Sequence, residues 1–87
     1  MSYDVILTKQ ARRDVKNLKS VGLLPKAESL LNVLSINPFQ NPPPFKKLLG
    51  EPSGVYSRRL NAQHRLVYTI DNTEKVVHII RMWSHYE

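Results

Sequence analysis

Residues 55–83 read VYSRRLNAQHRLVYTIDNTEKVVHIIRMW, and this stretch decides the fold. β-Branched and aromatic residues fill three short runs within it, at residues 55–60, 64–71 and 75–83. Short turns separate these runs, the first around Asn61-Ala62 and the second around Asp71-Asn72-Thr73. Runs of this composition that are joined by tight turns are typical of antiparallel β-strands. The stretch therefore predicts a three-stranded antiparallel meander.

The middle run predicts a sheet with two unlike faces. Side chains alternate between the faces of a strand, so residues two apart share a face. Leu66, Tyr68 and Ile70 lie on one face, and Arg65, Val67 and Thr69 lie on the other. We expect the apolar face to pack on the remainder of the chain, and Arg65 to project from the opposite face.

The segment before the meander predicts one strand followed by two helices. Residues 3–7 are apolar and β-branched enough for a strand, and Thr8 is a suitable helix N-cap. The first helix is expected to end at Gly22, and the second to begin near Pro25 and end before Pro38. The apolar positions at helical spacing are Ala11, Val15, Leu18 and Val21 in the first helix and Ala27, Leu30, Leu31 and Leu34 in the second. The order β-α-α-β-β-β predicts an α+β fold, in which a two-helix hairpin covers one face of a small, mainly antiparallel sheet.

A proline-rich segment separates the helices from the meander. Residues 37–44, NPFQNPPP, contain four prolines and cannot sustain a helix or an interior strand. We interpret this segment as an ordered loop within the fold, because the parts on either side are each too short to fold alone. The 87 residues are therefore expected to form a single domain, 1–87.

The composition is strongly basic for a chain of this length. Lysine and arginine number 13 against 7 acidic residues, which gives a net charge of +6 and an isoelectric point near 9.9. Such a charge favours a polyanionic partner. It does not by itself separate a nucleic acid from an acidic protein or a membrane surface.

The remaining composition points to the cytoplasm. No apolar run is long enough to cross a bilayer, and the N-terminal MSYDVILTKQ lacks the basic, apolar and small-residue regions of an export signal. The chain has no cysteine, which excludes disulfides, thiolate nucleophiles and thiolate metal sites. We expect a cytoplasmic protein that does not associate with a membrane.

The second half of the chain supplies the groups that RNA cleavage without a metal requires. This reaction needs a proton to be removed from the 2′-hydroxyl, charge to be stabilised on the phosphate, and the departing 5′-oxygen to be protonated. Histidine and fixed cations can do this work, and interleaved aromatic side chains can bind unstacked bases. The basic groups are Lys46, Lys47, Arg58, Arg59, Arg65, Arg81, His64, His78 and His85, and the aromatic groups are Tyr56, Tyr68, Trp83 and Tyr86. Because the three histidines do not have metal-ligand spacing, we predict neither a metal nor another cofactor.

Three motifs in this half resemble one known family. The runs SGVYSRRL at residues 53–60 and HRLVY at residues 64–68, with the terminal His85-Tyr86, are similar to the YoeB/Txe branch of the RelE toxin superfamily. The resemblance follows the element order over essentially the whole chain. It implies a type II toxin that cleaves messenger RNA on the ribosome, is usually dimeric, and is neutralised by a YefM/Phd-type antitoxin.

The resemblance also implies roles for individual residues. Arg59 and Arg65 match the arginines that hold the scissile phosphate and stabilise its transition state. His85 matches the histidine proposed as general acid, and Tyr86 matches the neighbouring aromatic residue that helps to position the RNA. Lys47, Arg58 and Trp83 are assigned to substrate binding.

Neighbouring residues of a strand face opposite sides of a sheet, which separates Arg58 from Arg59. At most one of the two can share a site with Arg65, and we choose Arg59. Arg58 is therefore also open to a structural interpretation, as a partner in an ion pair.

The chain departs from the family pattern at Lys46. Where the branch typically has Pro-Tyr-Glu-Lys-Leu, residues 44–48 read PFKKL, so that a lysine replaces the expected general base. Three explanations stay open: divergence toward a RelE-like site that uses lysines, a deliberate charge reversal that makes a toxic protein expressible, or replacement by Glu51. A protonated Lys46 braces a phosphate but cannot accept a proton, and positioned acid–base catalysis contributes about 100- to 10,000-fold. Lys46 is assigned to the catalytic set, with reduced activity expected.

Several residues have structural interpretations that compete with the functional ones. His64 follows a turn and is expected to form a hydrogen bond with a group of the turn or the backbone. His78 is expected to be packed and hydrogen-bonded. Trp83 could stack on a base, close the core or contribute to a dimer interface. The basic side chains of the first helix form a solvated face, with ribosomal RNA or an acidic antitoxin as alternative contacts.

Two other functions compete with the nuclease. A ParE-like toxin of the same fold would bind a protein and would need neither the histidine nor the phosphate clamp, and fold alone does not separate the two. A catalytically impaired toxin homologue would keep the binding surfaces without the activity. The joint presence of Arg59, Arg65 and the His85-Tyr86 terminus favours the nuclease.

Overall fold

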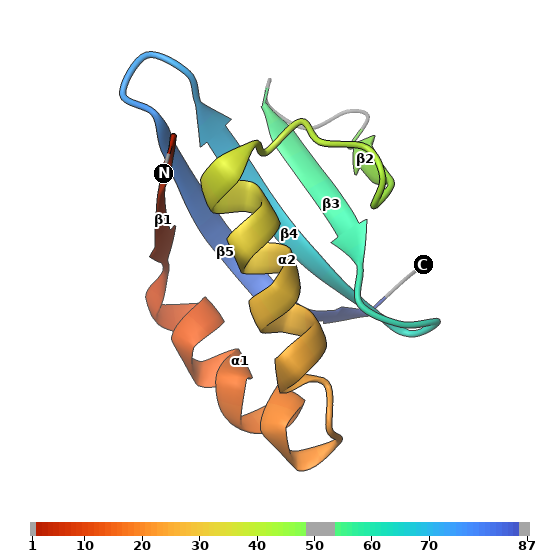
Figure 1. Cartoon of the computed structure of the whole chain (residues 1–87). Coiled ribbons are helices and arrows are strands. Elements are labelled where there is room, and N and C mark those ends of the chain that lie inside the picture. Colours follow the sequence, from red (N-terminus) through yellow and green to blue (C-terminus); the bar gives the residue numbers. More distant parts are fainter. Residues whose placement is uncertain (1, 49–53, 86–87) are drawn as a thin grey trace.

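The computed structural model describes the backbone of residues 2–48 and 54–85 and the side chains of these residues as far as Trp83. Its elements, in chain order, are β1 (Asp4–Leu7), α1 (Lys9–Ser20), α2 (Leu24–Ile36), β2 (Phe45–Lys47), β3 (Val55–Arg59), β4 (His64–Asp71) and β5 (Val76–His85). The strands form one sheet in the order β1-β5-β4-β3-β2 (Figure 1). β1 runs parallel to β5, and the other neighbours are antiparallel. The predicted α+β class is confirmed, with β2 as an additional strand.

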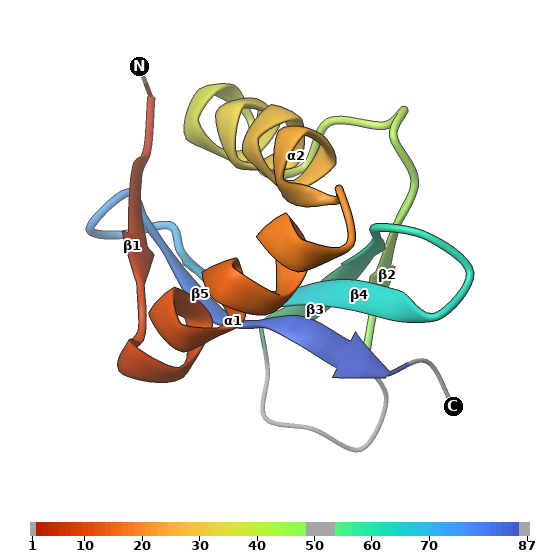
Figure 2. The same cartoon turned by 90° about the horizontal axis from the view of Figure 1, so that it is seen from below.

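Both helices lie on one face of the sheet and leave the other face open (Figure 2). The core lies between these two layers, where Leu66 and Tyr68 of β4 and Val77 and Ile79 of β5 are fully buried. These side chains pack with Ala11 and Leu18 of α1 and with Ala27, Leu30 and Leu34 of α2. The alternation predicted for the middle strand therefore holds: its apolar face packs on the helices, and Arg65 belongs to the open face.

The ends of α1 follow from local sequence. Thr8 is the N-cap, and its hydroxyl oxygen accepts a hydrogen bond from the backbone N–H of Ala11. Gly22, two residues after the helix, has a φ of 75°, a left-handed conformation that glycine adopts without steric cost. α2 begins one residue before Pro25, which agrees with the preference of proline for the first helical turn.

Three details differ from the sequence-based expectations. Val21 is 55% exposed, because it follows the end of α1 and no longer lies on the apolar face of that helix. His78 was expected to be packed, yet it is exposed, because Val77 and Ile79 take the core face of β5 and His78 takes the other. The three-residue β2 was not predicted, since residues 45–47 carry no strand pattern of their own and pair only through β3.

Neither helix in the described part of the chain is long and apolar enough to cross a bilayer.

Candidate active site

A cleft on the open face brings together side chains from three neighbouring strands. It is lined by Pro44, Phe45, Lys46, Ser57, Arg59 and Arg65, and has a volume of about 450 Å³. Three of these six residues are cations, and none of them carries a carboxylate. A cleft with this charge attracts anionic groups.

The sheet register places the two predicted arginines opposite each other. Arg59 at the end of β3 pairs with Arg65 at the start of β4, so both side chains leave the same face. The four-residue connection between β3 and β4, around Asn61, supports this register because Leu60 and Asn61 both donate backbone hydrogen bonds to the carbonyl oxygen of His64. The predicted pairing of Arg59 with Arg65 in one site agrees with this arrangement.

Ser57 orients Arg65 from the floor of the cleft. Its side chain is 2% exposed, and its hydroxyl oxygen accepts a hydrogen bond of 2.8 Å from Nη1 of Arg65. Ser57 was not among the residues predicted for the site. A signal was available, since residues two apart share a face and Ser57 precedes Arg59 by two positions.

Lys46 contributes the third cation from the edge strand. It pairs with Ser57, so it shares the face of Ser57, Arg59 and Arg65. Lys47, the next residue, pairs with Tyr56 and is not among the described residues that line the cleft. The position where the family pattern has a glutamate is therefore occupied here by a cation at the mouth of the cleft.

Arg58 lies on the opposite face and is 1% exposed. Its guanidinium donates hydrogen bonds to the carbonyl oxygens of Pro38, Gln40 and Pro43, and to the hydroxyl of Tyr68 at 3.0 Å. The same group lies 4.9 Å from the centre of the Phe45 ring. These contacts tie the proline-rich loop, and with it β2, to the sheet.

The position of Arg58 corrects two expectations. Its described partners are carbonyl and hydroxyl oxygens, so the structural interpretation holds but the expected ion pair does not. The assignment of Arg58 to substrate binding does not hold either, because a guanidinium that is buried and bonded to the loop carbonyls does not reach the open face.

Aromatic rings pack against one another on the face of the sheet opposite the cleft. Tyr56 stacks on Tyr68 with ring centroids 5.9 Å apart, and makes edge contacts with Phe39 and Phe45. Burial raises the pKa of the Tyr68 phenol above its ordinary value of 10.0, while the charge and hydrogen bond of Arg58 act in the opposite direction. The net shift is upward, so the Tyr68 phenol holds its proton to a higher pH than a solvated tyrosine does.

Trp83 and His64 lie against each other beside the core. Their rings stack with centroids 3.8 Å apart and an interplanar angle of 18°. His64 is 5% exposed, and the side chain of Asn61 accepts a hydrogen bond from its backbone N–H. Trp83 packs against the core cluster, which agrees with one of the three interpretations open for it, and it is not among the described residues that line the cleft.

Two predicted site residues fall at the C-terminal end. The backbone of His85 closes β5 and pairs with His64, next to the pair formed by Ser84 and Arg65. The side chain of His85 lies outside the described residues, as do Tyr86 and Glu51. The roles that the resemblance implies for them stay predictions.

A buried carboxylate on α1 was missed entirely. Asp14 is 1% exposed, and it accepts hydrogen bonds from the backbone of Met82 and Trp83 and from Arg81. Its spacing gave a signal, because Ala11, Asp14 and Leu18 lie at helical intervals on one buried face. Within the described residues, no three histidine or acidic side chains gather closely enough to hold a metal ion.

Solved structures with the same fold are small toxins. The YoeB dimer from Staphylococcus aureus superposes with a TM-score of 0.80 at 28% identity, and the match covers 99% of this chain and 100% of that one. A YoeB/ParE toxin from Agrobacterium tumefaciens gives a TM-score of 0.83 over 95% and 99% of the two chains, and at 24% identity it supports the fold alone. The fold and the cationic cleft together define a toxin of the RelE-like class.

The family follows from sequence. The model of the YoeB-like toxin of bacterial type II toxin-antitoxin systems matches residues 8–86. Toxin YoeB from Synechocystis sp. is 39% identical over 79 residues, which cover 87% of this chain and 79% of that protein. This chain belongs to the YoeB-like toxin family of bacterial type II toxin-antitoxin systems, as the motifs at residues 53–60 and 64–68 predicted.

Proposed function

We propose that this toxin is an endoribonuclease that cuts messenger RNA held on the ribosome. The observation that carries this proposal is the cleft in which Arg59 and Arg65 stand opposite each other on paired strands, with Lys46 beside them. Guanidinium groups bind phosphate through two parallel hydrogen bonds and stay charged at every physiological pH. A protein-binding toxin has no need for three cations around one cleft.

The two arginines act on the phosphate at the cut. Attack of the 2′-oxygen on the adjacent phosphorus forms the new P–O bond, breaks the bond to the 5′-oxygen, and passes through a state with additional negative charge on the phosphate oxygens. Fixed cations stabilise that charge without reorganising, and removing one such donor typically costs about 100- to 1,000-fold in rate. The hydrogen bond from Arg65 to the buried Ser57 restricts the arginine before the substrate arrives.

The two proton transfers have different agents: His85 supplies the proton for the leaving group, and solvent water takes the 2′-hydroxyl proton, because the described lining of the cleft holds neither a carboxylate nor a histidine. His85 protonates the departing 5′-oxygen, in the role that the resemblance implies for it. Lys46 braces the phosphate in its charged form and cannot take the 2′-hydroxyl proton in that form. We therefore propose a nuclease with reduced activity, for which the ribosome supplies much of the geometry by holding the message in place.

The partners are proposed from the relatives. The toxin is inferred to be a single cytoplasmic domain over residues 1–87, which forms a homodimer and binds a YefM/Phd-type antitoxin. Solved relatives include a YoeB dimer and a YoeB-YefM complex, both from Staphylococcus aureus. The net charge of +6 favours docking on the RNA of the 70S ribosome.

Cleavage on programmed ribosomes, with the ends of the products identified, tests this function. We expect the parent protein to leave a 2′,3′-cyclic or 3′-phosphate and a 5′-hydroxyl, and to cut free RNA poorly. His85→Ala should abolish cleavage, and Lys46→Glu should raise the rate because it restores a proton acceptor. Lys26→Ala, a change on the exposed side of α2, is the matched control and should cut at the parent rate.

Two outcomes separate the alternatives. If neither the parent nor Lys46→Glu cuts the message, the protein-binding toxin replaces the nuclease as the conclusion. If only Lys46→Glu cuts, the parent is a catalytically impaired toxin whose lost base lies at that position.

A further inference from the structure

Basic side chains line the exposed side of α1. They recur at intervals of three or four residues, and all of them are exposed: Lys9, Arg12, Arg13, Lys16 and Lys19. Because consecutive residues of a helix are about 100° apart, these side chains lie within an arc of about 120°. The buried Ala11, Asp14 and Leu18 lie on the opposite side of the helix. We call this set the basic stripe of α1.

The basic stripe and the cleft belong to different surfaces of the protein. Ala11, Asp14 and Leu18 face the sheet, so the stripe faces away from it. Both helices lie on one face of the sheet (Figure 2), whereas Arg59 and Arg65 of the cleft belong to the other face. The cations of the stripe are therefore not part of the site described above.

The stripe holds a large share of the positive charge of the protein. Five of the 13 lysine and arginine residues lie on α1, and Asp14, the one acidic residue of this helix, is buried. In the part of the chain that the structure describes, no carboxylate forms an ion pair with the stripe, since the ion pair found there joins Asp14 to Arg81. The described residues thus leave the charge of the stripe facing the solvent.

Helix stability does not account for the stripe. Cations near the N-terminus of a helix interact unfavourably with the helix dipole, and the first turn of α1 contains Lys9 and no acidic residue. Like charges three or four residues apart, such as Arg12 and Lys16, also destabilise a helix. The N-cap at Thr8 and the buried face stabilise α1, whereas the stripe opposes its formation. A contact with another molecule explains the stripe better than a structural role does.

The exposed side chains of α1 fit phosphate groups better than they fit a protein. Each exposed residue of this helix is basic or is an uncharged polar asparagine, glutamine or serine. These side-chain types bind phosphate oxygens in nucleic acids. The centres of protein interfaces instead contain aromatic or apolar anchors and are depleted in lysine. An anionic backbone is therefore a better match than an acidic protein.

The same side chains favour a double helix over a single strand. Single-stranded RNA is bound by aromatic rings on which its bases stack, and α1 contains no aromatic residue. Double-helical RNA is recognised mainly through its shape and its backbone, for which a straight row of cations is sufficient. The row from Lys9 to Lys19 is about 15 Å long, at about 1.5 Å per residue.

We propose that the basic stripe of α1 is a second RNA-binding surface, which docks on the phosphate backbone of double-helical RNA. This inference goes beyond the proposed cleavage, because docking requires no chemistry and does not involve the cleft. Binding of this kind does not depend on base sequence and weakens strongly as salt is added. Each phosphate contact contributes about one unit to the slope of log affinity against log salt concentration.

Binding of an RNA hairpin tests the stripe directly. The probe is a fluorescent hairpin with a stem of about 20 base pairs, somewhat longer than the roughly 16 that a double-stranded RNA-binding domain spans. Its affinity for the full chain is measured by fluorescence anisotropy between about 50 and 200 mM salt. Lys16→Glu reverses the charge at the middle of the stripe. It should weaken binding at least about fivefold and lower the salt slope by about one.

Lys75→Glu is the matched control, because it makes the same change of charge elsewhere. Lys75 is exposed in the turn between β4 and β5, which lies at the end of the molecule away from α1 (Figure 1). Its affinity for the hairpin should stay within about twofold of the parent value. In single-turnover cleavage on programmed ribosomes, the half-saturating ribosome concentration should rise for Lys16→Glu and match the parent for Lys75→Glu.

Three results would overturn the inference. One is a folded Lys16→Glu protein that binds the hairpin as tightly as the parent, and another is an equal loss in Lys75→Glu, which would mean that net charge alone acts. The third is a Lys16→Glu protein that loses affinity for poly-glutamate but keeps its affinity for the hairpin, which would assign the stripe to an acidic protein.

The test also separates the stripe from the proposed nuclease. A parent that does not cut the message overturns the nuclease, while hairpin binding still decides the role of the stripe. Circular dichroism shows whether each variant is folded. If Lys16→Glu does not fold, Lys16→Gln removes the charge and keeps the helix propensity, and it should show a smaller loss of hairpin affinity in the same direction.

Discussion

Arg58 and Arg59 are identical in chemistry and adjacent in the chain, yet the sheet gives them opposite tasks. Arg58 points into the protein and binds three carbonyl oxygens of the proline-rich loop, whereas Arg59 is exposed at the cleft. Strand alternation alone separates them. The pair therefore offers an internal comparison between an arginine that is buried against the loop and one that is exposed at the cleft.

The same substitution should lower the free energy of unfolding at Arg58 and leave it almost unchanged at Arg59. Arg58→Lys should lower the free energy of unfolding by about 2–4 kcal/mol, because a lysine cannot satisfy the separated carbonyls and each lost charged hydrogen bond contributes about 1.5–3 kcal/mol. Arg59→Lys should change it by no more than about 0.5 kcal/mol, as exposed substitutions usually do. Urea unfolding followed by circular dichroism measures both. Equal losses for the two variants would contradict the assignment.

Tyr68 should make stability depend on pH in the alkaline range. Burial raises its pKa above 10.0 in the folded protein, so the folded state holds the phenolic proton more tightly than the unfolded state does. This contribution is complete below pH 10 and is lost as the pH rises from 10 toward the folded pKa. The stability difference between the parent and Tyr68→Phe should therefore be constant from pH 7 to 9 and shrink above pH 10. If the stability difference between the two proteins does not vary with pH, the ionisation of Tyr68 does not contribute to the pH dependence of stability.

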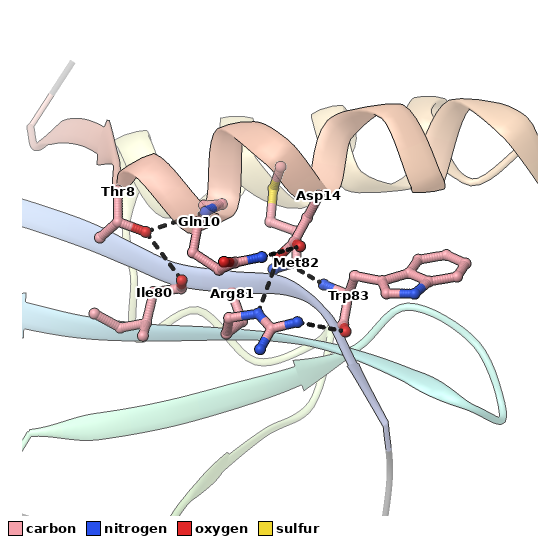
Figure 3. A network of polar contacts seen from close by, with 8 residues as sticks. Thr8, Gln10, Asp14, Ile80, Arg81, Met82 and Trp83 are labelled. Carbon is pink, nitrogen blue, oxygen red and sulfur yellow. Dashed lines mark hydrogen bonds and ion pairs between the residues drawn. The ribbon is translucent and has the colours of Figure 1, made fainter.

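At the scale of elements, α1 is joined to β5 at its N-cap and again at its middle. Thr8 caps the helix through Ala11 and also donates a hydrogen bond of 3.0 Å to the carbonyl oxygen of Ile80 (Figure 3). Nearly two turns later, Asp14 accepts hydrogen bonds from the backbone N–H groups of residues 82 and 83 in the same strand. Both contacts fall within the segment of β5 where its register with β4 shifts.

Replacing the cap tests that junction. Thr8→Ala should lower the free energy of unfolding by about 1–2 kcal/mol, because it removes the acceptor for the N–H of Ala11 and the donor to Ile80. Thr8→Ser keeps the hydroxyl and should stay close to the parent. Thermal unfolding of the three proteins measures the difference, and a serine variant as unstable as the alanine variant would mean that the methyl group matters instead.

Local patterns predict most of the fold but only part of the site. Alternation and helical spacing depend on residues that are near one another in the chain. They predict the strands at residues 55–60 and 64–71, the N-cap at Thr8 and the face of Arg65. β2 does not, because its three residues become a strand only when β3 lies beside them. The contacts of Asp14 with Met82 and of Arg58 with Pro38 join residues far apart in the chain, so composition and spacing indicate at most a buried polar side chain there.

At the scale of the whole molecule, one face of the sheet forms the core and the other carries the cleft. The helices cover one face of the sheet and supply part of the core (Figure 2). The cleft with its three cations belongs to the other face. In the proposed function, the net charge of +6 attracts the toxin to RNA, and the cleft determines where the phosphate is held.

The central claim, that the cleft around Arg65 carries RNA cleavage, is tested most directly by the single-turnover rate of message cleavage on programmed ribosomes. Arg65→Ala should lower this rate by about 100- to 1,000-fold, because it removes a fixed cation from the phosphate in the transition state. Lys26→Ala, which removes one positive charge from the far side of the helical layer, should cut at the parent rate. An Arg65→Ala protein that is folded and cuts as fast as the parent would contradict the account.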